Sequence, residues 1–190
     1  QSMIAQMCSK AIEQQEIAQS FIKELNYILS APNPDLTRLK DRVQKAVELF
    51  KSGYNCSQSV VAAFADMYGF TQEQALRMGA SFGGGIGRMR ETCGAACGMF
   101  LVAGLETGAT EATDREGKAA NYAVVQELAA EFKKRNGSLI CGELLGLKKK
   151  ELVSNVPEER TAQYYSKRPC AKMVEEAARI WSEYLENHPK

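Results

Sequence analysis

Apolar residues recur every three or four positions along most of the chain, which is the pattern of helices with one buried face. The clearest such stripe consists of Leu36, Leu39, Val43, Ala46, Val47 and Phe50. Similar stripes predict helices within residues 4–29, 56–68, 72–82, 93–107, 113–135 and 170–185. No segment alternates apolar and polar residues as a half-buried strand does. We therefore predict an all-α protein, a compact bundle of about seven helices with no sheet.

Local signals mark where several of these helices begin and end. Asn55 and Thr92 are expected N-caps, Thr71 to Gln74 forms a capping box, and Asn136-Gly137 ends the sixth helix. Residues 155–169 are expected to be an irregular loop. The "APNP" break divides the chain into an N-terminal helical arm, residues 1–34, and a four-cysteine domain, residues 35–190. The arm is a candidate contact in a homodimer.

Composition and charge narrow the classes of function. The net charge of +1 gives no basic footprint for nucleic acid or for a membrane surface, so no nucleic-acid partner is expected. The longest apolar run is too short for membrane insertion, and the first residues lack the layout of a signal peptide, which favours a cytoplasmic location. The single histidine, His188, is expected to be a solvated tail residue. The commonest general base and metal ligand is therefore missing.

A glycine-rich turn, "FGGGIGR", precedes the central cysteines. It matches neither the dinucleotide-binding fingerprint nor the Walker loop, because the required spacing and the lysine are missing. Two interpretations remain open: the glycines allow left-handed backbone and close packing, or their amides line an anionic site. On the second interpretation, the ligand-binding residues are Gly84, Gly85, Gly87 and Arg88.

Four of the six cysteines lie at or beside predicted helix starts, namely Cys56, Cys93, Cys141 and Cys170. Helix starts stabilise a thiolate and lower the pKa of a thiol. We expect the four sulfurs to meet in one pocket beside the glycine turn. Cys93 should be the most reactive thiol, since Arg88 and Arg90 precede it.

The other two cysteines have a different setting. Cys8 lies on an apolar stripe and is expected to be a small core residue. Cys97 follows Cys93 by one helical turn, on the same face. It either packs between helices, which we favour, or joins Cys93 as a ligand or resolving thiol.

The segments "GYNCSQSV", "FGGGIGRMRETCGAACGMFLVAGLETG" and "CGELLG", with one more cysteine after a loop, resemble the C-GCAxxG-C-C family. This four-cysteine family has a CGAxxG motif, and the resemblance runs from about Leu36 to the last helix. It places the family's cysteines on the same four positions. It implies a mostly helical protein with a redox role, and an electron-transfer or transporter-associated partner.

The resemblance also extends to the part of split-Soret cytochromes associated with an iron–sulfur centre. No haem is expected, because the chain has no C-x-x-C-H motif and no second histidine.

Three functions follow from these patterns. In the first, Cys56, Cys93, Cys141 and Cys170 are the catalytic residues of thiol–disulfide chemistry, or the metal ligands of an iron–sulfur cluster used for electron transfer. In the second, they bind structural zinc, although the usual C-x₂₋₄-C spacing is absent. In the third, the chain is a partner-binding helical module without catalysis. Whether the protein is an enzyme stays open at this point.

Overall fold

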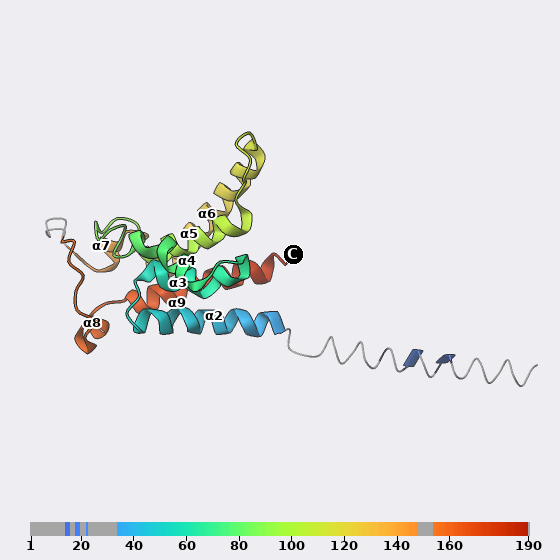
Figure 1. Ribbon diagram of the computed structural model, residues 1–190, viewed down its shortest axis with the longest axis horizontal. Helices are drawn as coiled ribbons and strands as arrows, with labels where there is room; N and C mark the ends of the chain where they lie inside the picture. Colours follow the sequence, from blue (N-terminus) through green and yellow to red (C-terminus); the bar gives the residue numbers. More distant parts are fainter. Residues whose placement is uncertain (1–13, 16–17, 20–21, 23–33, 148–153, 190) are drawn as a thin grey trace, which may run out of the picture. The chain divides into compact units, whose positions relative to one another are not determined.

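The computed structural model of the chain describes residues 14–15, 18–19, 22, 34–147 and 154–189 (Figure 1). The chain divides into two compact units, Gln1–Thr37 and Arg38–Lys190, and the fold described below is that of the second unit. Cys8 and most of the predicted arm lie outside the described residues. The arm, its role in a homodimer and the burial of Cys8 therefore stay predictions.

The prediction of an all-α bundle is confirmed. The described residues form eight α-helices and two short 3₁₀ helices, and their one β-type pairing is an isolated bridge between Thr92 and Ile140. In chain order the elements are α2 (Pro34–Lys51), α3 (Cys56–Phe64), η1 (Ala65–Tyr68), α4 (Gln72–Gly79), η2 (Ala80–Phe82), α5 (Gly94–Thr107), α6 (Arg115–Asn136), α7 (Cys141–Leu144), α8 (Ala162–Lys167) and α9 (Cys170–Asn187).

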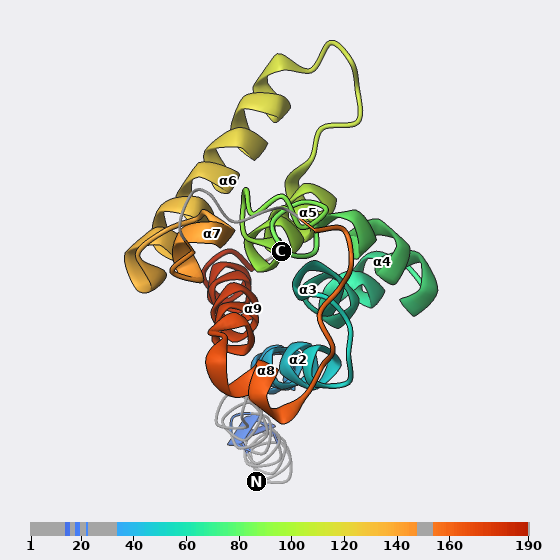
Figure 2. The same ribbon diagram turned by 90° about the vertical axis from the view of Figure 1, so that its left-hand side faces the viewer.

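The short helix α3 lies at the centre and packs against α4, α5 and α9 (Figure 2). Its residues are buried on nearly every side, and most of them are small. Two glycines allow the neighbouring helices to approach its first turn. A Cβ on Gly79 would lie 2.7 Å from the Gln58 amide nitrogen, and one on Gly98 would lie 2.8 Å from the Ser57 carbonyl oxygen. This close packing fixes the start of α3, where Cys56 lies.

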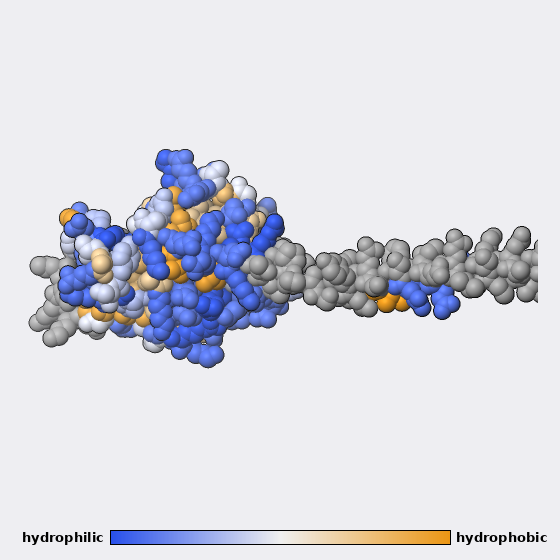
Figure 3. Space-filling model, turned by 90° about the horizontal axis from the view of Figure 1, so that it is seen from below, coloured by the Kyte–Doolittle hydropathy of each residue, from blue (hydrophilic) through white to orange (hydrophobic). Residues whose placement is uncertain are grey.

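Helices α2 and α9 contribute amphipathic faces to the same core. Most of the predicted stripe of α2 is buried between Leu39 and Phe50, although Val47 is only half-buried. Helix α9 buries Val174, Ala177 and Trp181 completely. Burial of each large apolar side chain contributes roughly 1.5–3 kcal/mol. The face drawn in Figure 3 is covered mainly by hydrophilic residues, with hydrophobic residues only in small groups. In the described residues, no helix combines the length and the apolar character that crossing a bilayer requires.

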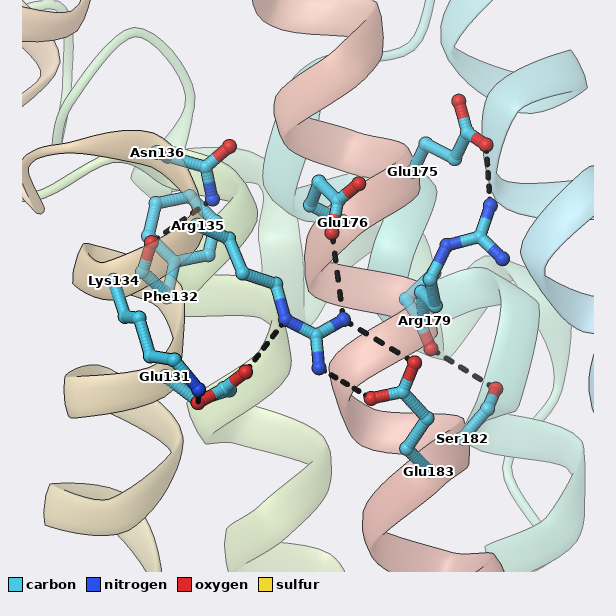
Figure 4. A network of polar contacts seen from close by, with 11 residues as sticks. Glu131, Phe132, Lys134, Arg135, Asn136, Glu175, Glu176, Arg179, Ser182 and Glu183 are labelled. Atoms are coloured by element: carbon cyan, nitrogen blue, oxygen red, sulfur yellow. Dashed lines mark hydrogen bonds and ion pairs between the residues drawn. The ribbon is translucent and has the colours of Figure 1, made fainter.

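A polar network joins α6 to α9 (Figure 4). The Arg135 guanidinium on α6 contacts Glu131 one turn earlier at 2.8 Å, and reaches across to α9 to contact Glu176 at 3.5 Å and Glu183. One arginine thus holds three carboxylates near one another. The pKa of Arg135 is raised, first by its hydrogen bonds to Glu183, so it stays charged.

Two local predictions need correction. Residues 155–169 are not wholly irregular, because Thr161 caps α8 by accepting a hydrogen bond from the Tyr164 amide at 3.2 Å. The N-cap of α5 is Cys93 itself rather than Thr92, because Thr92 is extended and pairs with Ile140. The predicted caps at Asn55 and at Thr71 are both confirmed as capping boxes.

Candidate functional site

One cavity of about 280 Å³ is lined by Cys56, Cys93, Cys141 and Cys170, and we call it the cysteine pocket. The four residues come from distant parts of the chain. Cys56, Cys141 and Cys170 are the first residues of α3, α7 and α9, and Cys93 is the N-cap of α5. In Figure 1 the starts of α3, α5 and α9 lie at the end of the bundle where α7 and α8 are drawn. Convergence of helix starts therefore brings the four sulfurs to one cavity.

The glycine-rich turn forms one wall of the cysteine pocket, with Gly84, Gly85, Gly87 and Arg88 all among the lining residues. Its backbone is left-handed over residues 84–88, so that even Ile86 and Arg88 have positive φ. Gly85 also packs tightly, because a Cβ there would lie 2.5 Å from the Cβ of Cys141. These contacts account for the turn by left-handed geometry and close approach. Ligand binding by these residues stays a prediction.

Backbone hydrogen bonds hold α7 against the segment that follows the glycine turn. The amide of Cys141 donates to the Glu91 carbonyl at 2.6 Å, and the Gly142 amide donates to the Arg90 carbonyl at 3.0 Å. The amide of Cys93 donates to the Leu139 carbonyl at 2.7 Å. Cys93 and Cys141 are therefore positioned by backbone bonds between segments about fifty residues apart in the chain.

Two of the four thiols interact directly. The Cys56 thiol donates a hydrogen bond to Cys170, which lowers the pKa of Cys170 to about 7 against the opposing effect of burial. The guanidinium groups of Arg168, Arg160 and Arg90 lower it further by their charge. The same hydrogen bond, together with burial, raises the pKa of Cys56 well above its ordinary value. Cys170 is therefore the thiol of the cysteine pocket that ionises near neutral pH.

Cys93 behaves differently from the expectation for a helix start. Burial raises the pKa of Cys93 to about 12, although the nearby amides of Ala95 and Ala96 favour its thiolate. Only 5% of the residue is exposed, so the cost of removing the charge from water exceeds what the helix start returns. The expected lowering of its pKa is therefore wrong. The charge of Arg90 instead lowers the pKa values of Cys141 and Cys170. At Cys141 the effect of burial is larger, so the pKa of that thiol is still raised.

Cys97 is not among the residues that line the cysteine pocket. Its thiol lies 3.8 Å from the Thr92 carbonyl oxygen and donates to it, and burial raises its pKa to about 11. This position suits the packing interpretation.

The basic residues that precede α9 in the pocket lining were not predicted from the sequence. Arg160 and Arg168 line the cysteine pocket together with Glu158 and Tyr164. The Arg160 guanidinium stacks 4.7 Å above the Tyr164 ring and donates to the Tyr54 carbonyl at 3.2 Å. The available signal was two arginines on either side of a tyrosine pair, directly before the last cysteine.

A metal centre needs several donor side chains grouped around one point. Among the residues that the structure describes, no three side chains of cysteine, histidine, aspartate or glutamate are grouped so that they could hold a metal ion. The four residues share a pocket, and Cys170 is the one of the other three that acts most strongly on the pKa of Cys56. This arrangement fits a pair of thiols better than a four-ligand centre.

Comparison with known proteins adds one finding. A family model described as "Putative redox-active protein (C_GCAxxG_C_C)" matches residues 54–184, which include all four cysteines of the pocket. No curated protein and no solved structure gives a significant match.

Proposed function

Because the chain belongs to the C_GCAxxG_C_C family, whose description is redox-active, we propose that it is a thiol–disulfide redox protein. The reactive pair is Cys170 as nucleophile and Cys56 as resolving thiol. The observation that carries the proposal is that both cysteines line the cysteine pocket, where interaction with Cys56 lowers the pKa of Cys170. A thiolate is the reactive form of cysteine, and an adjacent second thiol is what a dithiol–disulfide cycle requires.

The reaction takes two electrons from the protein to a substrate disulfide, written R–S–S–R′. The Cys170 thiolate attacks one sulfur, forming a mixed disulfide with R–S and releasing R′–S⁻. Cys56 then loses its proton to R′–S⁻ and attacks the Cys170 sulfur. This step forms the Cys56–Cys170 disulfide and releases R–S⁻, which takes up the proton that Cys170 gave to solvent when it ionised. The dithiol is oxidised, and the substrate leaves as two thiols.

The order of these steps follows from the contact between the two thiols. The hydrogen bond to Cys170 is the largest cause of the raised pKa of Cys56. When Cys170 enters the mixed disulfide it loses its negative charge, and this hindrance to the ionisation of Cys56 disappears. Cys56 therefore becomes a better nucleophile only after the first step, which favours attack on the mixed disulfide.

The raised pKa values of the other thiols are also consistent with this function. Four thiolates in one cavity would repel one another strongly. Burial keeps Cys93 and Cys141 protonated at neutral pH, and Cys56 is protonated as well, so the pocket carries at most one thiolate, on Cys170. The sulfurs can then lie together without a cation.

Disulfide mapping tests the proposal. The reduced protein is treated anaerobically with bis(2-hydroxyethyl) disulfide, quenched with acid, alkylated and digested for mass spectrometry. We expect a Cys56–Cys170 disulfide in the parent chain, and in Cys56→Ser a mixed disulfide that stops at Cys170. Cys97→Ser is the matched control and should form the same disulfide as the parent.

Three results would contradict the proposal. The first is a Cys93–Cys141 disulfide, and the second is the absence of an adduct at Cys170 in Cys56→Ser. The third is stoichiometric iron or zinc in the anaerobically purified protein that is lost in Cys170→Ser, which would make the sulfurs metal ligands.

A further inference from the structure

The cysteine pocket is strongly basic. Among the described residues that line it, four are arginines, Arg88, Arg90, Arg160 and Arg168, and one is acidic, Glu158. The chain as a whole has a net charge of only +1, so this concentration of positive charge is local. Low-dielectric walls around such a cluster increase its attraction for an anion.

Glu158 cannot neutralise the arginines around it. Its carboxylate bonds to Arg168, and the same oxygen lies 3.7 Å from Arg88 and 3.8 Å from Arg90. One carboxylate thus faces three guanidinium groups, and Arg160 adds a fourth cation to the pocket. A thiolate on Cys170 offsets one more charge, which leaves two positive charges in excess.

Arg160 is fixed in the pocket wall with part of its hydrogen-bonding capacity unused. Its Nη2 donates to the Tyr54 carbonyl, but its Nη1 is buried and has no hydrogen-bond partner. Rings hold the guanidinium in place, with Phe50 at 4.6 Å and Tyr164 at 4.7 Å from the central carbon. A buried donor without a partner is costly, and native proteins rarely retain one. Arg160 lines the cavity, so the charge of its guanidinium acts on a ligand bound there.

From this geometry we infer that the substrate of the cysteine pocket is a small disulfide that carries carboxylate groups, and that Arg160 binds one of them. The inference rests on the proposed function and names its substrate class. A carboxylate matches the planar, two-pronged guanidinium group, and a charge-assisted hydrogen bond to it is strong. The cavity, about 280 Å³, is at the small end of ligand pockets, which suits a small molecule.

Three disulfides with the same central –CH₂CH₂–S–S–CH₂CH₂– unit provide the test, since they differ only in their end groups. They are 3,3′-dithiodipropionate with two carboxylates, bis(2-hydroxyethyl) disulfide with two hydroxyls, and cystamine with two ammonium groups. We expect the rate constant for oxidation of the reduced protein to fall in that order, at least tenfold from the first to the last. Added salt should reduce the difference, because it screens charge.

The variant Arg160→Gln assigns the effect to one side chain. We expect the ratio of the dithiodipropionate rate to the hydroxyethyl disulfide rate to fall about tenfold, the range of a lost charge-assisted hydrogen bond. The ratio is the informative quantity, because any change in the ionisation of Cys170 affects both rates equally. Arg77→Gln removes an exposed arginine that lies outside the pocket lining, and should leave the ratio unchanged.

A binding measurement separates failure of this inference from failure of the proposed function. Suberate has the length of dithiodipropionate and two carboxylates but no sulfur. It should bind the reduced protein in calorimetry more tightly than 1,8-octanediol, and should slow the alkylation of Cys170. Equal rates for the three disulfides, with no suberate binding, would overturn the inference and leave the dithiol chemistry intact. Suberate binding without any disulfide reduction would instead refute the proposed function and keep the anion site.

Discussion

The hydrogen bond from Cys56 to Cys170 can be removed or kept by substitution at one position. Cys56→Ala deletes the donor, whereas Cys56→Ser replaces the weak S–H donor with a stronger O–H donor of similar size. The two variants differ in the property that matters here, the ability to donate to the Cys170 sulfur. We expect the pKa of Cys170 to rise in Cys56→Ala and to stay near or below its parent value in Cys56→Ser.

The size of the change follows from the contact. A hydrogen bond to a charged group contributes roughly 1.5–3 kcal/mol, and a thiol donor belongs at the low end. That energy corresponds to a rise of about one pH unit in the ionisation midpoint. With a pKa of about 7, about half of Cys170 is thiolate at pH 7 in the parent chain. In Cys56→Ala the ionised fraction should fall to about a tenth.

The assay is peptide-resolved alkylation of Cys170 over a pH series from about pH 5 to about pH 9. The parent rate should rise with pH to a plateau, with its midpoint at about pH 7, the pKa of Cys170, and the Cys56→Ala midpoint should lie about one pH unit higher. Comparing midpoints avoids the separate effect of pKa on nucleophilicity, which changes rates in the opposite direction. The same midpoint in the parent and in Cys56→Ala would refute the hydrogen bond as the cause. Rapid labelling of Cys93 at pH 7 would refute the assignment of the nucleophile.

Two further predictions concern the scaffold. Gly85→Ala should lower the free energy of unfolding, measured by chemical denaturation, by more than Gly53→Ala. Both glycines have positive φ, and left-handed backbone alone costs an ordinary residue roughly 1–2 kcal/mol, but of the two only a Cβ added at Gly85 would meet a side chain, that of Cys141. Arg135→Met should destabilise the protein by about 1 kcal/mol, because it leaves three carboxylates without their shared cation. Arg179→Met removes one exposed ion pair and should lower the melting temperature less, so equal losses in melting temperature for the two variants would contradict the bridging role of Arg135.

The parts of the fold that the sequence predicted depend on short-range chemistry. The capping boxes at Asn55–Gln58 and Thr71–Gln74 form between residues three apart, and the stripe from Leu39 to Phe50 records one face of a single helix. Cysteines at helix starts could be recognised for the same reason. That the starts of α3, α5, α7 and α9 face one cavity was an inference from the number of such cysteines, and the structure places all four in its lining.

The features that sequence reasoning missed depend on long-range packing. The pKa of Cys93 is set by burial, which no local signal reports, so the helix-start argument gave the wrong direction. Arg160 reaches the pocket because its guanidinium stacks on Phe50, a residue more than a hundred positions away. The same holds for Glu158, whose importance arises from arginines that lie near it in space but not in the chain.

The strained backbone beside the pocket also has an explanation in these contacts. Ile86, Arg88 and Arg90 have φ between 55° and 67°, a region that costs an ordinary residue roughly 1–3 kcal/mol. Such strain persists only where surrounding bonds determine the backbone. Here the Arg88 amide donates to the Gly83 carbonyl, and the Arg90 carbonyl accepts from Gly142 at the start of α7. The left-handed turn lets Gly85 pack against Cys141 while Arg88 and Arg90 both reach Glu158. Asparagine or glycine at position 88 or 90 would relieve strain but remove a guanidinium from the pocket, so the presence of arginine at both strained positions favours a role for their charge over one in folding alone.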